Sequence, residues 1–221
     1  MDGVEIDEDG KLYFLCSKMR IVNGGHTPFL HGKGGTFGGP PAKGNRFPMT
    51  GTIIKTRGKD ARILVGGSVV PMEPLPTRPP DLIDSGYEFE EYQKGTWAWA
   101  EGAEWMYAGV SPVRFRGCNC PSPRFCTDWY KRTLAPEAYR CSIGVLDANG
   151  NLIMHIGQYG NLDSGDGPKS KIPVGGDGIG VFHPRAVAAT DNYLAFSNWE
   201  EWVTVMKIAY HAEETAGILG K

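Results

Sequence analysis

The segment from Ser142 to Asn161 constrains the fold more than any other part of the chain. It reads S-I-G-V-L-D-A-N-G-N-L-I-M-H-I-G-Q-Y-G-N, with short apolar runs on both sides of a polar centre. Asn149 and Gly150 tolerate a positive φ, which a tight β-hairpin needs between its strands. The segment therefore predicts a hairpin whose strands cover residues 143–146 and 152–156.

Similar strand and turn patterns recur along the chain. Residues 3–15 form a second such unit around an acidic turn that contains Gly10. The 31 glycines and 16 prolines favour many short strands joined by turns. The other predicted strands cover residues 125–129, 133–136, 141–146, 186–189, 193–197 and 204–208, with a further pair at 52–56 and 62–65 joined by the turn 57–60.

Three segments share one plan, namely residues 2–15, 125–156 and 184–208. Each predicts a small antiparallel sheet that cannot bury both of its faces alone, so neighbouring sheets must stack. Radial stacking of such units gives a β-propeller. We therefore expect an all-β, propeller-like fold.

The sequence V-L-D-A-N-G-N-L-I-M-H-I-G-Q-Y-G-N, followed by H-P-R-A-V-A-A-T-D-N-Y-L-A-F-S-N and V-M-K-I, resembles NHL-repeat β-propeller proteins of the large bacterial type. The resemblance covers residues 117–211 and extends more loosely to residues 3–65. Ser197-Asn198-Trp199 and Trp202-Val203 depart from the family pattern, which indicates a degenerate last blade.

The resemblance and the repeats together predict one propeller-type domain with about three four-stranded blades, which is too few to close a ring. The expected blades cover residues 1–65, 117–160 and 181–210. Residues 20–48 are expected to form a long Gly/Pro-rich loop insertion in the first blade. Residues 66–116 combine a proline-rich connector with an aromatic segment.

The preferred function is a non-catalytic interaction or ligand-binding module that acts through loops at the mouth of the propeller. The alternative is a metal-dependent enzyme with a channel site, similar to lactonase-like hydrolases or lyases of propeller fold. The partner would be another protein or a second copy of the chain that completes the ring. A formal net charge of -2 gives no electrostatic reason to expect nucleic acid.

Two clusters carry residue types that bind metals. Cys118, Cys120, Cys126 and Cys141 could bind zinc, form a disulfide or remain inert thiols, since their spacing is not that of a zinc ribbon. Asp163 and Asp166 lie in a glycine-rich loop that could hold calcium, although surface turns use the same residues. Zinc and calcium are therefore the candidate cofactors.

Other residues point to contacts rather than chemistry. Trp199 and Trp202, flanked by glutamates, suit a partner surface, and His26 and His31 share the glycine-rich loop. Trp97, Trp99, Trp105 and Tyr107 predict packing between blades, with a stacking surface for a ligand as the alternative.

Several motifs are missing from the sequence. A phosphate-binding loop and a C-x-x-C-H motif are absent, which argues against nucleotide and covalent haem. Neither a signal peptide nor an apolar run of membrane-spanning length is expected, and the compartment stays open.

Overall fold

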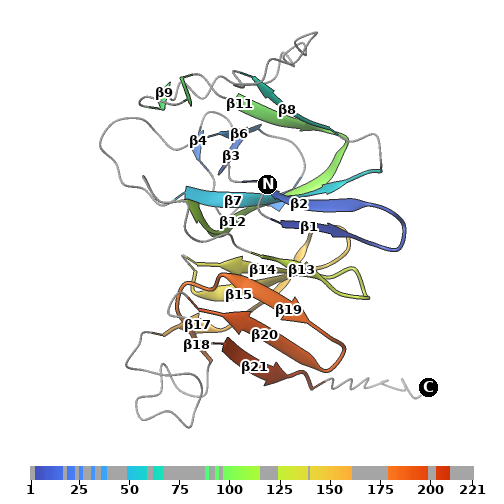
Figure 1. Ribbon diagram of the computed structural model, residues 1–221, viewed down its shortest axis with the longest axis vertical. Helices are drawn as coiled ribbons and strands as arrows, with labels where there is room; N and C mark the ends of the chain where they lie inside the picture. Colours follow the sequence, from blue (N-terminus) through green and yellow to red (C-terminus); the bar gives the residue numbers. More distant parts are fainter. Residues whose placement is uncertain are drawn as a thin grey trace, which may run out of the picture.

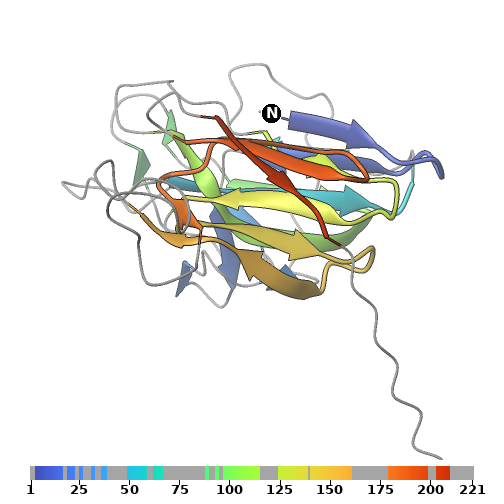
Figure 2. The same cartoon turned by 90° about the horizontal axis from the view of Figure 1, so that it is seen from below.

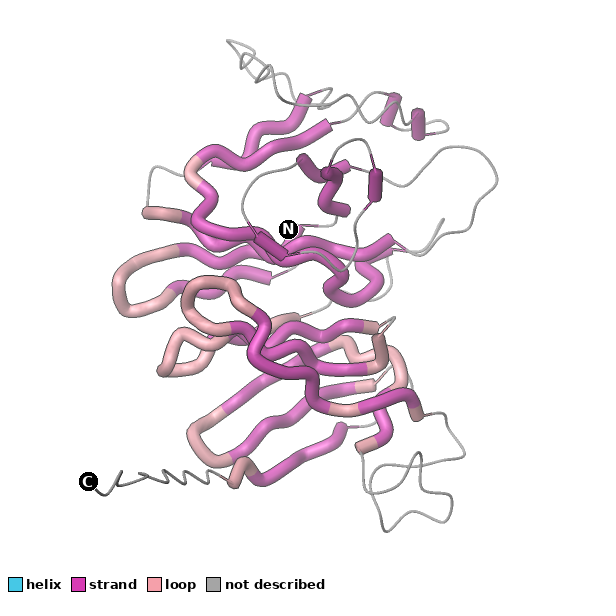
Figure 3. Tube along the Cα trace, turned by 180° about the vertical axis from the view of Figure 1, so that it is seen from behind, coloured by secondary structure: helices cyan, strands magenta, loops and turns pink. Residues whose placement is uncertain are grey.

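Short antiparallel strands build the part of the chain that the computed structural model describes. Within that part every regular element is a strand and no helix occurs (Figure 3). The prediction of an all-β chain is confirmed for these residues. The structure describes residues 3–16, 19–22, 25–26, 31–32, 36–38, 49–58, 62–66, 88–89, 93–94, 97–114, 124–138, 140–160, 179–198 and 203–209.

Four sheets lie one above another along the longest axis of the molecule (Figure 1). We call them, from top to bottom, the distal, N-terminal, middle and C-terminal sheets. Viewed from below, the strands of successive sheets overlie one another face to face (Figure 2). Among the described residues none of these sheets closes on itself.

The N-terminal sheet starts from the hairpin at the beginning of the chain. Strands β1 and β2 pair antiparallel, and β2 then pairs with β7, which pairs with β12. Its strands, in order across the sheet, are β1 Gly3–Ile6, β2 Leu12–Cys16, β7 Met49–Thr56, β12 Ala103–Arg114 and β5 His31–Gly32.

The distal sheet is connected to the N-terminal sheet by a pair of strands that runs from one sheet into the other. Beyond a corner at Arg57 and Gly102, the β7–β12 pair continues as the antiparallel pair β8–β11. The Arg57 amide donates to the Gly102 carbonyl at 2.7 Å, and Gly102 takes a φ of 75°. The strands of this sheet, in order, are β4 Gly25–His26, β3 Met19–Val22, β6 Thr36–Gly38, β11 Trp97–Glu101 and β8 Arg62–Gly66, and a separate small pair is β10 Gln93–Lys94 with β9 Glu88–Phe89.

The middle sheet is a four-stranded meander. Its two central strands, β14 and β15, are buried along their whole length because sheets cover both of their faces. Its strands, in order, are β13 Cys126–Thr127, β14 Thr133–Glu137, β15 Ser142–Leu146 and β16 Leu152–Ile156.

The C-terminal sheet ends the stack. It contains β19 Ala186–Ala189, β20 Tyr193–Ser197 and β21 Val203–Lys207, all antiparallel. A short parallel pair, β17 Gln158–Tyr159 with β18 Gly180–Val181, lies between the middle and C-terminal sheets in the sequence.

Two apolar cores hold three of these sheets together. The first joins the N-terminal sheet to the middle sheet, and the second joins the middle sheet to the C-terminal sheet. The buried members of the first core are Tyr13, Leu15, Ile53, Trp105, Tyr107, Val110, Phe125, Ala135 and Leu146. The buried members of the second core are Leu134, Ile143, Val181, Val187, Leu194 and Phe196.

Several predicted strands are confirmed. The hairpin at residues 143–156 is formed by β15 and β16, and residues 3–15 give β1 and β2. The predicted strands at residues 186–189 and 193–197 coincide with β19 and β20. Trp105 and Tyr107 pack in the first core, as the aromatic segment predicted.

Other expectations need correction. The strands on either side of residues 57–60 do not pair with each other, because β7 and β8 belong to different sheets. Residues 20–48, expected to be a loop, contribute strand pairing to two sheets through β3, β4, β5 and β6. The aromatic segment, which no expected blade includes, supplies β12 to the N-terminal sheet. The tail at residues 211–217, whose sequence predicts a short helical turn, lies outside the described residues.

Candidate functional site

Three hairpin turns share one construction. Each begins with an aspartate and places its fourth residue in the left-handed region: Gly10, Lys131 and Gly150 have φ values of 73°, 59° and 81°. In each turn the fourth amide donates to the aspartate carbonyl, at 2.9 Å, 2.9 Å and 3.0 Å. This is the pattern of a three-residue hairpin loop, in which a type I turn is followed by a left-handed residue.

The aspartate side chains fasten these turns. Asp7 Oδ1 accepts the amides of Asp9 and Lys11 at 3.1 Å and 2.9 Å. Asp147 Oδ1 accepts the amides of Asn149 and Asn151, both at 2.8 Å. An aspartate oxygen that accepts backbone amides two and four residues ahead keeps the loop rigid.

The middle turn, residues 128–132, presents two exposed aromatic rings. The Trp129 side chain is 75% exposed and that of Tyr130 is 62% exposed. Asp128 accepts the Arg132 amide at 2.9 Å and its Nε at 2.6 Å, and the Arg132 guanidinium lies 5.2 Å from the Tyr130 ring centre. Asp128 and Arg132 therefore fix the position of the hairpin tip that carries the two rings.

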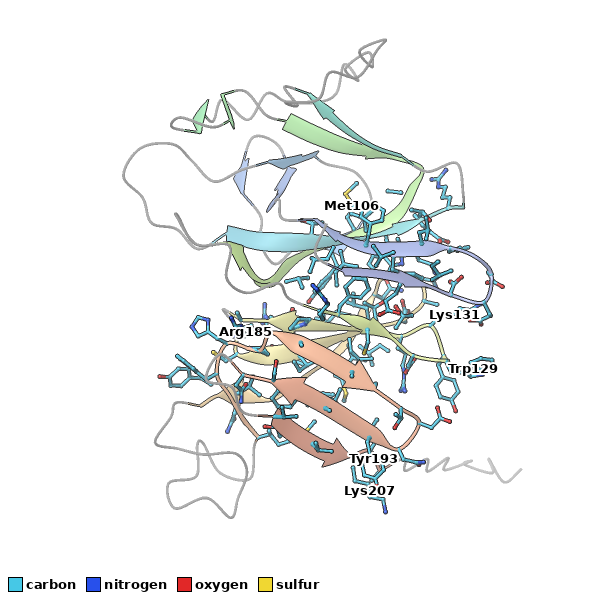
Figure 4. The ribbon with its side chains drawn as sticks, in the orientation of Figure 1. Met106, Trp129, Lys131, Arg185, Tyr193 and Lys207 are labelled. Carbon is cyan, nitrogen blue, oxygen red and sulfur yellow. The ribbon has the colours of Figure 1, made fainter. Side chains whose placement is uncertain are left out.

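Ion pairs tie this tip to the neighbouring hairpin. Lys131 Nζ lies 2.6 Å from Asp9 Oδ2 and 3.2 Å from Glu8 Oε1. The hydrogen bond with Asp9 raises the pKa of Lys131. The two turns thus share one surface, which lies toward the same side of the molecule as Tyr193 and Lys207 (Figure 4). We call the turns at residues 7–11, 128–132, 147–151 and 190–193 the turn end.

A buried polar network lies between the N-terminal and middle sheets. Glu137, at the end of β14, is 1% exposed. Its carboxylate accepts hydrogen bonds from the hydroxyls of Tyr107 and Ser142, the latter at 2.8 Å. His155 Nδ1 lies 2.8 Å from Glu137 Oε2, and Arg140 Nε lies 3.8 Å from the same oxygen.

The groups around the Glu137 carboxyl group are closely packed. Burial, with a further contribution from the Glu137 carboxylate, raises the pKa of Tyr107 above its ordinary value, so the phenol remains a donor. A Cβ built on Gly144 would lie 3.1 Å from Glu137 Cδ and 3.1 Å from the Tyr107 hydroxyl. Two hydroxyl donors and the His155 ring nitrogen surround one carboxyl group, an arrangement that satisfies its buried polar atoms and fixes the orientation of the His155 ring.

The two described cysteines of the predicted zinc cluster do not form a site. Cys126 lies in β13, and burial, with the Glu5 and Asp128 carboxylates, raises the pKa of its thiol to about 12. Cys141 was expected in a strand but lies in the turn before β15, with a φ of 54° and Sγ 3.5 Å from the Ala138 carbonyl. Burial also raises the pKa of Cys141.

Both described thiols are therefore protonated near neutral pH, which makes them poor ligands and poor nucleophiles. Neither forms a disulfide within the described residues. In the same part of the chain no group of three His, Cys, Asp or Glu side chains could hold a metal ion. Burial as small apolar groups accounts for Cys126 and Cys141.

The structure leaves the other predicted site residues apart or undescribed. His26 lies in β4 of the distal sheet and His31 in β5 of the N-terminal sheet, so their backbones belong to different sheets. The side chains of both, and the whole of Cys118, Cys120, Asp163, Asp166, Trp199 and Trp202, lie outside the described residues.

Sequence reasoning missed Trp129 and Tyr130. The signal was present in the three turns D-E-D-G-K, D-W-Y-K-R and D-A-N-G-N, which place the same residue types at the first position. Aligned on their aspartates, they put Trp129 where the other turns carry Glu8 and Ala148. A bulky ring at a loop position that a small or charged residue fills elsewhere indicates a contact function.

No protein-family model matches the chain, and neither a curated protein nor a solved structure does. None of the described residues forms a helix long and apolar enough to cross a membrane.

Proposed function

We propose that this chain is a non-catalytic binding module, built on NHL-type propeller blades, that contacts a protein partner through the turn end. The observation that carries the proposal is the exposure of Trp129 and Tyr130 on a rigid hairpin tip. Stacked antiparallel sheets with a repeated aspartate turn support the propeller part, which needs further sheets to complete a ring.

The chemistry of the tip favours a protein surface as its target. Trp and Tyr contribute large contact areas and lose little side-chain entropy, so they dominate binding energy at protein interfaces. The charged groups around them, Lys131 and Arg132, are already engaged by Asp9 and Asp128. The tip therefore offers aromatic rings rather than free positive charge, which gives an anionic ligand little to bind.

A double substitution at the tip tests the proposal. Trp129→Ala with Tyr130→Ala should abolish capture of a partner that the wild-type chain retains, quantified by mass spectrometry of matched pull-downs. Tyr159→Ala is the control, because Tyr159 is an aromatic residue that is 57% exposed on β17, outside the four turns of the turn end. Retention of the same partners by the double variant would contradict the proposal.

The alternative is a metal-dependent hydrolase or lyase, and the His155–Glu137 pair is the observation that favours it. A carboxylate on Nδ1 orients a histidine so that Nε2 can bind a metal or move a proton. Metal analysis of the purified chain, before and after a chelator, separates the two functions. A stoichiometric divalent ion that is lost together with a hydrolytic activity would support the enzyme and count against the binding module.

A further inference from the structure

The outer face of the C-terminal sheet is almost entirely apolar. Residues alternate between the two faces of a strand, so one set from each strand points away from the middle sheet. Leu194 and Phe196 point inward and are 1% exposed. The outward set, read from the strand register, is Ala186, Ala188, Tyr193, Ala195, Ser197, Val203, Val205 and Lys207.

The largest outward side chains are well exposed. Val203, Val205 and Tyr193 are 67%, 63% and 50% exposed. Lys207 is the single charged residue of the outward set, and it lies beside Tyr193 at one end of the face. Figure 4 shows Tyr193 and Lys207 together at the outer side of the stack.

This composition is unusual for a sheet face that no described sheet covers. Arrays of stacked units normally end in a capping unit with a polar outer face, because an exposed apolar end face lowers the solubility of the protein and promotes its association. The faces through which the middle and C-terminal sheets meet a neighbouring sheet carry the two buried apolar cores. The outer face has the same apolar character, and within the part of the chain that the structure describes no sheet lies over it.

The face is also complementary to itself. Its central row pairs Ala188, Ala195 and Val205, and the row at one end contains the bulky Tyr193 and Lys207. The row at the other end contains the smaller Ala186, Ser197 and Val203. Consider a two-fold axis that lies in the plane of the interface, perpendicular to the strands, along the central row. Rotation about this axis exchanges the two ends of the strands, so each bulky row lies over the partner's small row.

We propose that two copies of this chain pair through the outer faces of their C-terminal sheets, related by a two-fold axis near Ala195 and Val205. Such an isologous contact uses one patch twice and needs only self-complementarity. It extends the sheet stack across the axis and makes Val205 a central contact. This pairing does not depend on the binding role of Trp129, because the tip residues Trp129 and Tyr130 are not part of this face, although Tyr193 belongs both to the face and to the turn end.

Sedimentation velocity of the full chain over a roughly hundredfold concentration range tests the pairing, since a dimer dissociates by mass action. The wild-type chain should sediment as a dimer at the upper concentrations. Val205→Lys should weaken self-association roughly tenfold or more, because each copy would place a charge in the centre of the apolar contact. Wild-type chain that stays monomeric throughout would overturn the proposal and leave the face to a different polypeptide.

Val4→Lys is the matched control. Val4 is also an exposed strand valine, 55% exposed in β1, but it lies in the N-terminal sheet. Its substitution should leave the dimer intact, and equal weakening by V4K and V205K would overturn the proposal. Circular dichroism should show unchanged folding for both variants, since both side chains are largely exposed.

Cross-linking gives an independent readout if a lysine proves disruptive. V205C should be joined into a dimer by a short bismaleimide cross-linker, because the two-fold axis brings the two copies of this position to opposite sides of an interface about 10 Å thick. V4C should not. Absence of the cross-link in V205C, or equal cross-linking of the two variants, would overturn the proposed geometry.

Discussion

The ammonium of Lys55 donates a hydrogen bond to the carbonyl oxygen of Ala148, 2.7 Å away, and so joins the N-terminal sheet to a turn of the middle sheet. The Lys55 side chain is 4% exposed, and it also lies 3.6 Å from Glu104 and 5.2 Å from the centre of the Tyr13 ring. Trp105 Nε1 donates to the same carbonyl at 3.2 Å. Two donors from the N-terminal sheet thus fix the position of the Asp147–Asn151 turn.

Lys55→Met should lower the free energy of unfolding by about 1–3 kcal/mol, because a hydrogen bond from a charged donor is lost in a buried site. Lys11→Met is the control, since Lys11 contacts Glu104 at 3.0 Å in a more exposed ion pair that contributes about 1 kcal/mol or less. Chemical denaturation measures both. Equal losses of unfolding free energy in the two variants would show that the burial of Lys55 does not strengthen its contribution to stability.

Gly150→Ala should destabilise the fold far more than Gly10→Ala. Both glycines have a positive φ, so each substitution strains the backbone by about 1 kcal/mol. A Cβ on Gly150 would also lie 2.5 Å from Trp105 Cγ, whereas a Cβ on Gly10 meets nothing within 4 Å. The clash should add about 1–3 kcal/mol. Denaturation midpoints measure the difference, and similar values for the two variants would contradict the packing of this turn.

Lys131→Gly should raise the thermal midpoint. Lys131 occupies the left-handed position that glycine fills in the other two turns, and a side chain is disfavoured there. The exposed ion pair with Asp9 that the substitution removes contributes little. Lys131→Ala separates the two effects, because it removes the ion pair and keeps the Cβ. Calorimetry should therefore give a higher thermal midpoint for the glycine variant than for the wild type. The thermal midpoint of the alanine variant should be no higher than that of the wild type.

Tyr107→Phe should lower the free energy of unfolding by about 1–2 kcal/mol, because the buried Glu137 carboxylate loses a donor. Tyr130→Phe is the matched control. The Tyr130 ring is exposed and its stacking with Arg132 survives the change. Urea denaturation should separate the two variants, and a neutral Tyr107→Phe would mean that the network does not stabilise the contact between the sheets.

Asp147→Asn should remove part of the acid sensitivity of folding. Partial burial opposes ionisation of Asp147, but hydrogen bonds from Asn151, Asn149 and Gly150 hold its pKa below the ordinary value of 3.8. Because the pKa is lower in the folded state, the stabilisation is present above pH 3.8 and is lost as the pH falls through the folded value. The variant should have a lower free energy of unfolding than the wild type at pH 7. This difference should vanish once the pH falls below the pKa of Asp147 in the folded state.

Asp191→Asn controls for simple loss of an exposed carboxylate, since Asp191 lies exposed in the turn between β19 and β20. Denaturation from pH 7 down to acid measures both variants. A constant difference between the wild type and Asp147→Asn at every pH would contradict the linkage.

Local signals predicted the hairpins well and the sheets poorly. Asn149-Gly150 and Gly10 mark turns by their own backbone preferences, so β15–β16 and β1–β2 follow from neighbouring residues. The pairing of β7 with β12 joins residues such as Ile54 and Met106, which lie far apart in the sequence. Nothing local distinguishes the corner at Arg57 from a hairpin turn.

The candidate site was harder to predict for a similar reason. The Glu137 network needs Tyr107 from another sheet, and only the stacking of two sheets brings the two residues together. Cysteine spacing suggested metal chemistry, but the burial that protonates Cys126 and Cys141 depends on tertiary packing. The exposure of Trp129 was predictable in principle, since its turn repeats the pattern of two others.

The parallel pair β17–β18 has a practical consequence for protein engineering. The Gly160 amide donates to the Val181 carbonyl at 3.0 Å, and a Cβ on Gly160 would lie only 2.7 Å from Gly180 Cα. Gly160 and Gly180 therefore lie side by side, although they are far apart in the sequence. A guest peptide or reporter domain with adjacent termini, spliced between these two glycines, would be displayed without pulling the middle and C-terminal sheets apart.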